Sequence, residues 1–168
     1  MPKKLTWFLI SVGVLIGIIF AINFFTLNLP VSNHLSEDYR NESLEMSVRY
    51  SYYVNPNRIA ISLDKCEEAA PVDILRGLLQ TAEALKSRSF SKVELYKGFD
   101  HRFTLSGKYF KQLGEEYDFQ NPVYTARTLP EKLTNPDGTK AYYNFRSGFA
   151  GLSEEMETFS EFTVDWCK

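Results

Sequence analysis

The sequence predicts an α+β fold: one N-terminal transmembrane helix, then a small domain in which a mainly antiparallel sheet of about six strands, arranged as three hairpins, packs against about three helices. Three observations support this prediction. A long apolar run begins the chain, segments of period-two alternation occur in pairs around turn residues, and segments of helical period follow these pairs. The 168 residues provide one ordinary domain besides the apolar run.

The apolar run covers residues 5–25 and contains no Asp, Glu, Lys or Arg. At about 1.5 Å per helical residue it reaches roughly 31 Å, which matches the hydrocarbon core of a bilayer. A cleaved signal peptide is the alternative, but its apolar region usually has about 7–15 residues and ends in small side chains. The run here is longer and ends in Phe24 and Phe25, which favours a retained anchor in contact with the lipid bilayer.

The charges around the apolar run predict its orientation. Lys3 and Lys4 precede it, whereas the first charged residues after it are Glu37 and Asp38. The positive-inside rule therefore places residues 1–4 in the cytoplasm as a short stub and the rest of the chain in the periplasm or outside the cell. Without the two lysines, 17 basic residues remain against 21 acidic ones. This mildly acidic balance argues against a nucleic-acid partner.

The remaining chain divides into a linker and a domain. Residues 26–46 mix proline, asparagine, serine and charges without a sustained period, which predicts a linker with, at most, a short helical piece. The exported α+β domain is predicted over residues 47–168. Its three hairpins are expected to pair residues 47–54 with 58–63, 92–97 with 101–105, and 123–129 with 139–145; its helices are expected over residues 71–85, 107–117 and 152–166. This order predicts helices on one face of the sheet.

Two cysteines, Cys66 and Cys167, lie in the predicted exported part. In an oxidising compartment such a pair is more often bonded than free, so the sequence predicts a disulfide between them. The bond would close a loop of roughly 100 residues, which is worth about 4.7 kcal/mol in the chain-entropy model. Two buried, unpaired thiols are the alternative.

Residues with catalytic potential are few. The sequence has no CxxC, HExxH, GxSxG or P-loop motif, and two histidines are too few for a zinc site, so neither a metal nor another cofactor is predicted. Asp100, His101 and Ser106 stand close together, and an envelope hydrolase that uses Asp100 and His101 is the alternative function. Neighbours on a strand point to opposite faces, however, and Ser106 directly precedes a helical stretch that its hydroxyl can cap.

Aromatic residues make up 15% of the chain, and tyrosine is enriched at protein interfaces. Tyr53 and Tyr142 are expected on the outer faces of their strands. A long loop near Arg127, Tyr143 and Arg146 resembles the loops that rigid scaffolds use for binding. These five residues form the predicted partner-binding surface.

We therefore expect a non-catalytic, single-pass membrane-anchored protein whose exported domain binds a protein partner in the cell envelope. Two versions stay open: an accessory subunit of an envelope complex, and an immunity-type protein that blocks an exported toxin. A sensor is disfavoured, because a cytoplasmic stub of about four residues has no room for a signalling output. Gly13 and Gly17 have the small-xxx-small spacing of closely packed transmembrane helices, so helix pairing in a homo-oligomer is a further hypothesis.

Overall fold

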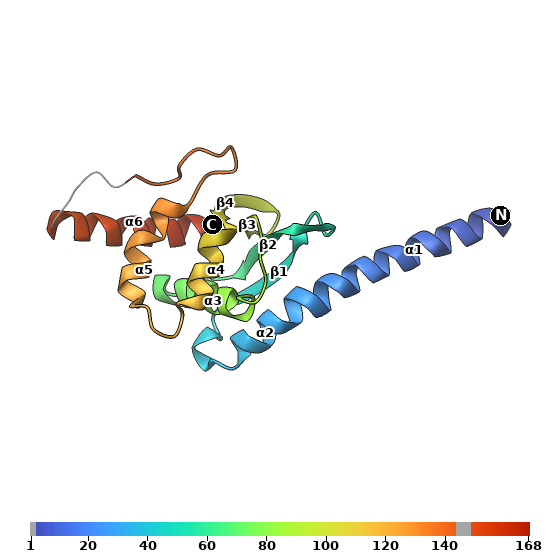
Figure 1. Ribbon diagram of the computed structural model, residues 1–168, viewed down its shortest axis with the longest axis horizontal. Helices are drawn as coiled ribbons and strands as arrows, with labels where there is room; N and C mark the ends of the chain where they lie inside the picture. The colour runs from blue at the N-terminus through green and yellow to red at the C-terminus, as the bar shows by residue number, and fades with distance from the viewer. Residues whose placement is uncertain (1–2, 144–148) are drawn as a thin grey trace.

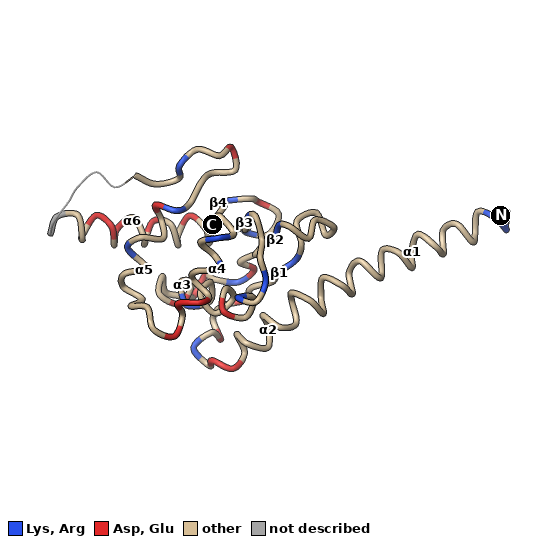
Figure 2. Tube along the Cα trace, viewed as in Figure 1, with Lys and Arg blue, Asp and Glu red and all other residues tan. Residues whose placement is uncertain are grey.

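The computed structural model describes residues 3–143 and 149–168 (Figure 1). Its first feature is one uninterrupted helix, here called the apolar helix, which runs from Lys3 to Ser36 and consists of α1 (Lys3–Asn23), a π-helical turn (Phe24–Asn28) and α2 (Leu29–Ser36). α1 projects from the rest of the molecule, and beyond its first residues it carries no charged side chain (Figure 2). By length and composition the apolar helix is able to cross a membrane.

The folded domain is built on one mixed sheet. Its strands, in order across the sheet, are β1 (Glu45–Ser51), β2 (Asn55–Lys65), β3 (Lys92–Lys97) and β4 (Asp100–Ser106). β1 with β2 and β3 with β4 are antiparallel hairpins, whereas β2 and β3 run parallel. A parallel pair requires a crossover connection, and here α3 (Pro71–Ala84) provides it.

The helices of the domain cover one face of this sheet. Besides α3 they are α4 (Gly107–Glu115), α5 (Pro122–Thr128) and α6 (Phe149–Cys167), with two short 3₁₀ turns at Tyr39–Asn41 and Pro130–Lys132. The strand register aligns the buried side chains of Val48, Ile61, Leu95 and Phe103 in one row. The ring of Phe162 from α6 packs on Phe103 at 5.6 Å, so this row faces the helices. The first two predicted hairpins and the three predicted helices are confirmed to within a few residues.

The third predicted hairpin is wrong. Residues 123–129 belong mostly to α5, because Pro122 occupies the first helical turn and the side chain of Asn121 accepts a hydrogen bond from the amide of Val123 at 2.9 Å. Within residues 139–143, Lys140 forms only an isolated bridge with Thr134, and residues 144 and 145 lie outside the described chain. The described sheet therefore has four strands of mixed direction in place of six antiparallel ones.

The predicted linker over residues 26–46 is also wrong. The structure has a helix over most of this segment, and Leu27, Val31 and Leu35 face the domain at four-residue spacing and belong to its hydrophobic core. Pro30 does not break the helix: it stands directly after the π-helical turn, and the helix continues through it to Ser36. β1 then begins at Glu45, before the predicted domain boundary.

The predicted disulfide between Cys66 and Cys167 is present, with a Cα–Cα distance of 5.9 Å. It joins the end of β2 to the last residue of α6 and closes a loop with a sequence separation of 101. The neighbouring Trp166 is fully buried and donates a hydrogen bond from Nε1 to the carbonyl oxygen of Tyr96 at 3.0 Å. The C-terminal helix is thus fixed to the sheet both covalently and by packing.

Candidate functional site: the junction between the apolar helix and the domain

The apolar helix meets the domain along the free edge of β1. The outer strand of a sheet presents unpaired N–H groups, which otherwise remain available to other chains. The Oδ1 atom of Asn23 accepts a hydrogen bond from the amide of Tyr50 at 2.7 Å, and the Oδ1 atom of Asn28 accepts one from the amide of Val48 at 3.0 Å. Two asparagines of the helix therefore cover the edge of the sheet.

The π-helical turn explains how both asparagines reach the same strand. In an α-helix, residues five positions apart point about 140° away from each other. A π-turn, with hydrogen bonds from residue i to i+5, adds one residue to the turn and brings Asn28 back to the side of Asn23. On β1, the amides of Val48 and Tyr50 are two residues apart and so point to the same edge. The helix geometry is thereby matched to the strand.

Asn23 is the most closely bound residue of the junction and is only 4% exposed. Its Nδ2 group donates to the carbonyl oxygens of Ile19 and Tyr53, each at 2.8 Å, while its Oδ1 atom accepts from Tyr50. Every polar atom of this side chain is therefore paired. The asparagine at the end of α1 is explained by this contact with the turn between β1 and β2.

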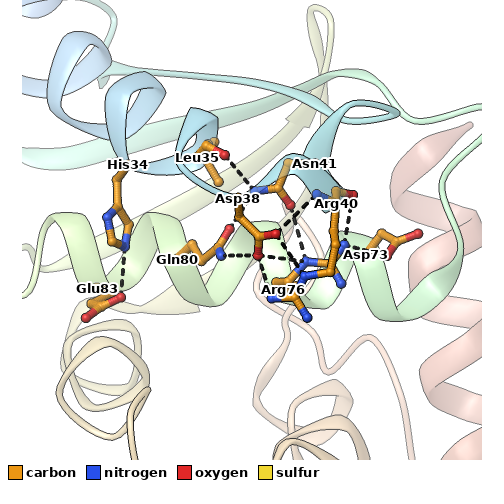
Figure 3. A network of polar contacts seen from close by, with 9 residues as sticks. All are labelled: His34, Leu35, Asp38, Arg40, Asn41, Asp73, Arg76, Gln80 and Glu83. Atoms are coloured by element: carbon orange, nitrogen blue, oxygen red, sulfur yellow. Dashed lines mark hydrogen bonds and ion pairs between the residues drawn. The ribbon is translucent and has the colours of Figure 1, made fainter.

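A polar network holds the end of α2 on α3 (Figure 3). At its centre, the buried Asn41 donates from Nδ2 to the carbonyl oxygen of Leu35 at 2.8 Å and to Oε1 of Gln80 at 2.7 Å. Arg76 of α3 donates from Nε to Oδ1 of Asn41 at 3.3 Å. Buried polar groups are tolerated when they are paired in this way, so the network fixes the chain after the apolar helix in one position.

Asp38 is the acidic residue of this network. Arg40 forms a bidentate pair with it, Nε to Oδ1 at 2.8 Å and Nη2 to Oδ2 at 2.6 Å, and Gln80 donates to Oδ2 at 3.0 Å. These hydrogen bonds, foremost those from Arg40, hold the pKa of Asp38 well below its usual range. Arg76 lies 3.6 Å from the same carboxylate and also pairs with Asp73 at 2.6 Å. The carboxylate therefore stays ionised at physiological pH.

A further contact of the apolar helix with α3 joins His34 to Glu83. The Nε2 atom of His34 lies 2.8 Å from Oε2 of Glu83 (Figure 3). Its Nδ1 atom lies 3.6 Å from the carboxylate of Glu37. Together with the Asn41 network, this pair fixes the end of the apolar helix and the chain that follows it on α3. The junction is therefore a fixed connection between two parts of one folded unit.

A row of planar groups crosses the sheet face opposite the helices, beginning at the apolar helix. The ring of Phe20 lies 4.8 Å from that of Tyr53, and the guanidinium of Arg49 lies over Tyr53 at 5.0 Å and over Tyr96 at 5.3 Å. Tyr96 in turn stacks on His101, with ring centroids 4.9 Å apart and planes inclined by 15°. The guanidinium of Arg49 therefore contacts two aromatic rings.

Tyr53, predicted on the outer face of a strand, instead lies in the turn of the β1–β2 hairpin. Its φ of 64° and that of Tyr52, 54°, are left-handed, a conformation that non-glycine residues rarely adopt. The contacts of Tyr53 with Asn23, Phe20 and Arg49 compensate for this conformation. Tyr53 therefore belongs to the junction and lies apart from the other residues predicted to bind a partner.

The structure distributes the other predicted partner-binding residues over the side of the domain near α5 and α6. Tyr142 is only 9% exposed, and its hydroxyl donates to Oδ2 of Asp165 at 3.0 Å; burial and then this hydrogen bond raise its pKa above the usual range. Tyr143 is exposed, and Arg127 is half exposed with its Nε paired to Glu155. Arg146 lies outside the described residues. Binding of a partner by these residues stays a prediction.

The residues of the predicted hydrolase alternative bind separate groups. The Nε2 atom of His101 lies 3.0 Å from the carbonyl oxygen of Phe103 and 3.0 Å from Oγ1 of Thr104. Asp100 is paired with Arg102 at 3.3 Å. These contacts join neither side chain to the other.

Ser106 caps α4, as predicted: its hydroxyl accepts a hydrogen bond from the amide of Tyr109 at 3.2 Å. Within residues 3–143 and 149–168, no group of three or more His, Cys, Asp and Glu side chains is placed to hold a metal ion.

Gly13 and Gly17 lie on the exposed surface of α1, where an added Cβ would meet no described atom of this chain within 4 Å. Their pairing with a second helix stays a hypothesis.

Comparisons with protein-family models, with curated proteins and with solved structures found no match for this chain. Within the described chain, the junction is the feature that places the domain relative to the apolar helix.

Proposed function

We propose that this chain is a non-catalytic, single-pass membrane protein whose exported domain binds a protein partner in the cell envelope. In this proposal α1 spans the bilayer with its N-terminus in the cytoplasm, as the lysines at that end favour. The supporting observation is that one continuous helix has an exposed apolar surface over α1 and a buried apolar surface in the domain core over α2. On α1, Trp7 is 71% exposed, and a helix surrounded by such side chains is suited to lipid.

The fixed junction supports a partner at the same membrane. A domain on a flexible linker samples many heights and orientations, and ordering it on binding costs conformational entropy. Here the covered edge of β1 and the Asn41 network hold the domain at one height above the end of α1. Such a domain is pre-organised for a protein that is itself embedded in the bilayer or bound to it. An accessory subunit and an immunity-type inhibitor both meet this description.

The proposed contact surface is α5 together with the residue Phe119 before it. Figure 1 places α5 on the side of the domain opposite to α1, so this surface is directed away from the proposed membrane span. Phe119, Val123 and Tyr124 are large, exposed side chains, and Arg127 follows on the same helix. Aromatic residues and arginine are enriched at protein interfaces, which favours this part of the surface.

Photocrosslinking in cells tests this surface. A photoreactive phenylalanine analogue at Phe119 or Tyr124 is expected to capture the same single protein, whereas the analogue at Tyr39 captures none of it. Tyr39 is a matched control, because it is also an exposed tyrosine but lies in the turn after α2. Identical adducts at all three positions, or no protein adduct at Phe119 and Tyr124, would reject the proposed surface.

The proposed orientation is tested with an external protease. Intact cells with a permeabilised outer envelope should lose the domain to digestion while a cytoplasmic marker stays intact. Protection of the domain would place it in the cytoplasm and contradict the proposal.

The hydrolase alternative gains no support from the separate contacts of Asp100 and His101, and an unchanged phenotype of His101→Ala would count further against it.

A further inference from the structure

A crevice of about 190 Å³ lies between the apolar helix and β1. The apolar part of its lining consists of Phe20, Phe24 and Val48. The polar part includes Asn28, Ser47 and Arg49. Among the described lining residues Arg49 is the one charged side chain, and there is no carboxylate. The crevice thus combines an apolar wall from the helix with a single positive charge from the strand.

The position of the crevice along the helix follows from the two asparagines. The amides on either side of Arg49 are bonded to Asn23 and Asn28, so Arg49 lies level with the turn between these residues. A span of about 31 Å that begins at Leu5 ends at Phe25. Figure 1 shows the β1–β2 turn on the side of the domain from which α1 projects. The crevice therefore lies where hydrocarbon gives way to lipid headgroups.

Arg49 has donors available in this position. Its guanidinium is held between the rings of Tyr53 and Tyr96, and within the described part of the chain it makes no hydrogen bond or ion pair. Stacking on aromatic faces leaves the N–H groups in the guanidinium plane free, and their fork matches the oxygens of a phosphate. A half-buried arginine without an acidic partner is thus oriented for an anion.

We propose that this crevice binds the headgroup phosphate of an anionic phospholipid from the leaflet around the end of α1, with Arg49 as the phosphate ligand and the acyl chains along Phe20 and Phe24. The charge of the crevice favours this occupant, since the ammonium of a zwitterionic headgroup would find no carboxylate among the described lining residues. Its volume also fits, because pockets that enclose a whole drug-sized ligand measure about 300–1,000 Å³ and this one has room for a headgroup only. The inference rests on the proposed membrane span and is independent of the protein partner.

The test uses the full chain in lipid nanodiscs that contain phosphatidylglycerol and phosphatidylcholine in equal amounts. After transfer to mild detergent, native mass spectrometry counts the lipids that each chain retains. The wild type is expected to retain one phosphatidylglycerol in preference to phosphatidylcholine, and Arg49→Gln should weaken this preference about tenfold or more, because hydrogen bonds to charged groups are among the strongest in proteins. Equal retention of the two lipids by the wild type overturns the proposal without any variant.

Lys92→Gln is the matched control, because it removes the same charge from an exposed position of the same sheet, outside the crevice. An equal loss in Lys92→Gln and Arg49→Gln would indicate diffuse attraction and overturn a specific site. Displacement of the lipid by inorganic phosphate at a similar concentration would overturn the commitment to a lipid. Flotation with liposomes after a carbonate wash separates the two proposals: a chain that fails to float lacks the span, whereas a floating chain without lipid preference lacks only the site.

Discussion

Replacing Leu27 with alanine should destabilise the folded domain as strongly as a substitution in the middle of its core. Leu27 is 0% exposed although it follows the predicted span by only two residues, and it packs with Val31 and Leu35 in the domain core. Truncating a buried leucine costs about 2–5 kcal/mol, through lost burial and the cavity left behind. We expect about 3 kcal/mol here. Phe25→Ala is the matched control, because Phe25 is on the same helix but 65% exposed, and exposed substitutions change stability by about 0.5 kcal/mol or less.

Urea unfolding of the full chain in mild detergent measures this difference. Trp166 is fully buried and reports on the domain, and a Trp7→Phe background removes the other tryptophan. With a slope of about 1–3 kcal/mol per molar urea, a loss of about 3 kcal/mol lowers the midpoint by about 1–3 M. Equal midpoints for Leu27→Ala and Phe25→Ala would refute the reasoning, because the helix after the span would then be no part of the domain core.

Three further predictions concern the domain itself. Serine in place of both Cys66 and Cys167 should lower the free energy of unfolding by about 2–5 kcal/mol, because the long loop is no longer closed, and thiol labelling of the denatured, unreduced wild type should give no adduct. Gly114→Val should abolish the cooperative urea transition, because the added Cβ would lie 2.2 Å from a backbone carbonyl oxygen of α3. Tyr142→Phe should cost about 1 kcal/mol, since Asp165 loses its phenolic donor. Because the pKa of Tyr142 is raised, its contribution to the stability of the fold is complete below about pH 10 and is lost only at higher pH. Difference ultraviolet titration of the wild type and the variant measures this pKa.

The contrary results are equally distinct. Two reactive thiols in the denatured wild type would exclude the disulfide. An unchanged urea transition of Gly114→Val would show that α4 does not pack closely on α3. A tyrosine that titrates near pH 10 in the wild type and is missing from Tyr142→Phe would show that its hydroxyl is neither buried nor bonded to Asp165.

The parts of the fold that sequence patterns predicted are those in which local and tertiary preferences agree. In β2, Ile59, Ile61 and Leu63 alternate with smaller or polar residues, and the structure buries all three against the helices. The segment 123–129 has many β-branched or aromatic residues, which favour a strand, but the helix-start signal of Asn121 and Pro122 outweighs them. Residue propensity therefore predicted a strand where capping determines a helix.

The junction was missed because its meaning depends on a strand that is distant in sequence. The spacing of Leu27, Val31 and Leu35 is visible in the sequence, but Pro30 and the polar residues between them suggested a linker. Asn23 was the one available signal of the candidate site, since it is a strongly polar residue at the end of an apolar run. The role of Asn23 in covering the edge of β1 depends on the folded position of that strand, which the local sequence does not reveal.

A spin-label distance measurement tests most directly whether the apolar helix and the domain form one rigid unit in a membrane. Labels on cysteines introduced at Ser11 of α1 and Lys65 at the end of β2, both exposed positions, report on the helix and the domain of the full chain in nanodiscs. The native cysteines are bonded to each other and do not take up label. A single narrow distance distribution is expected. A broad distribution would show a flexible connection and contradict the rigid junction.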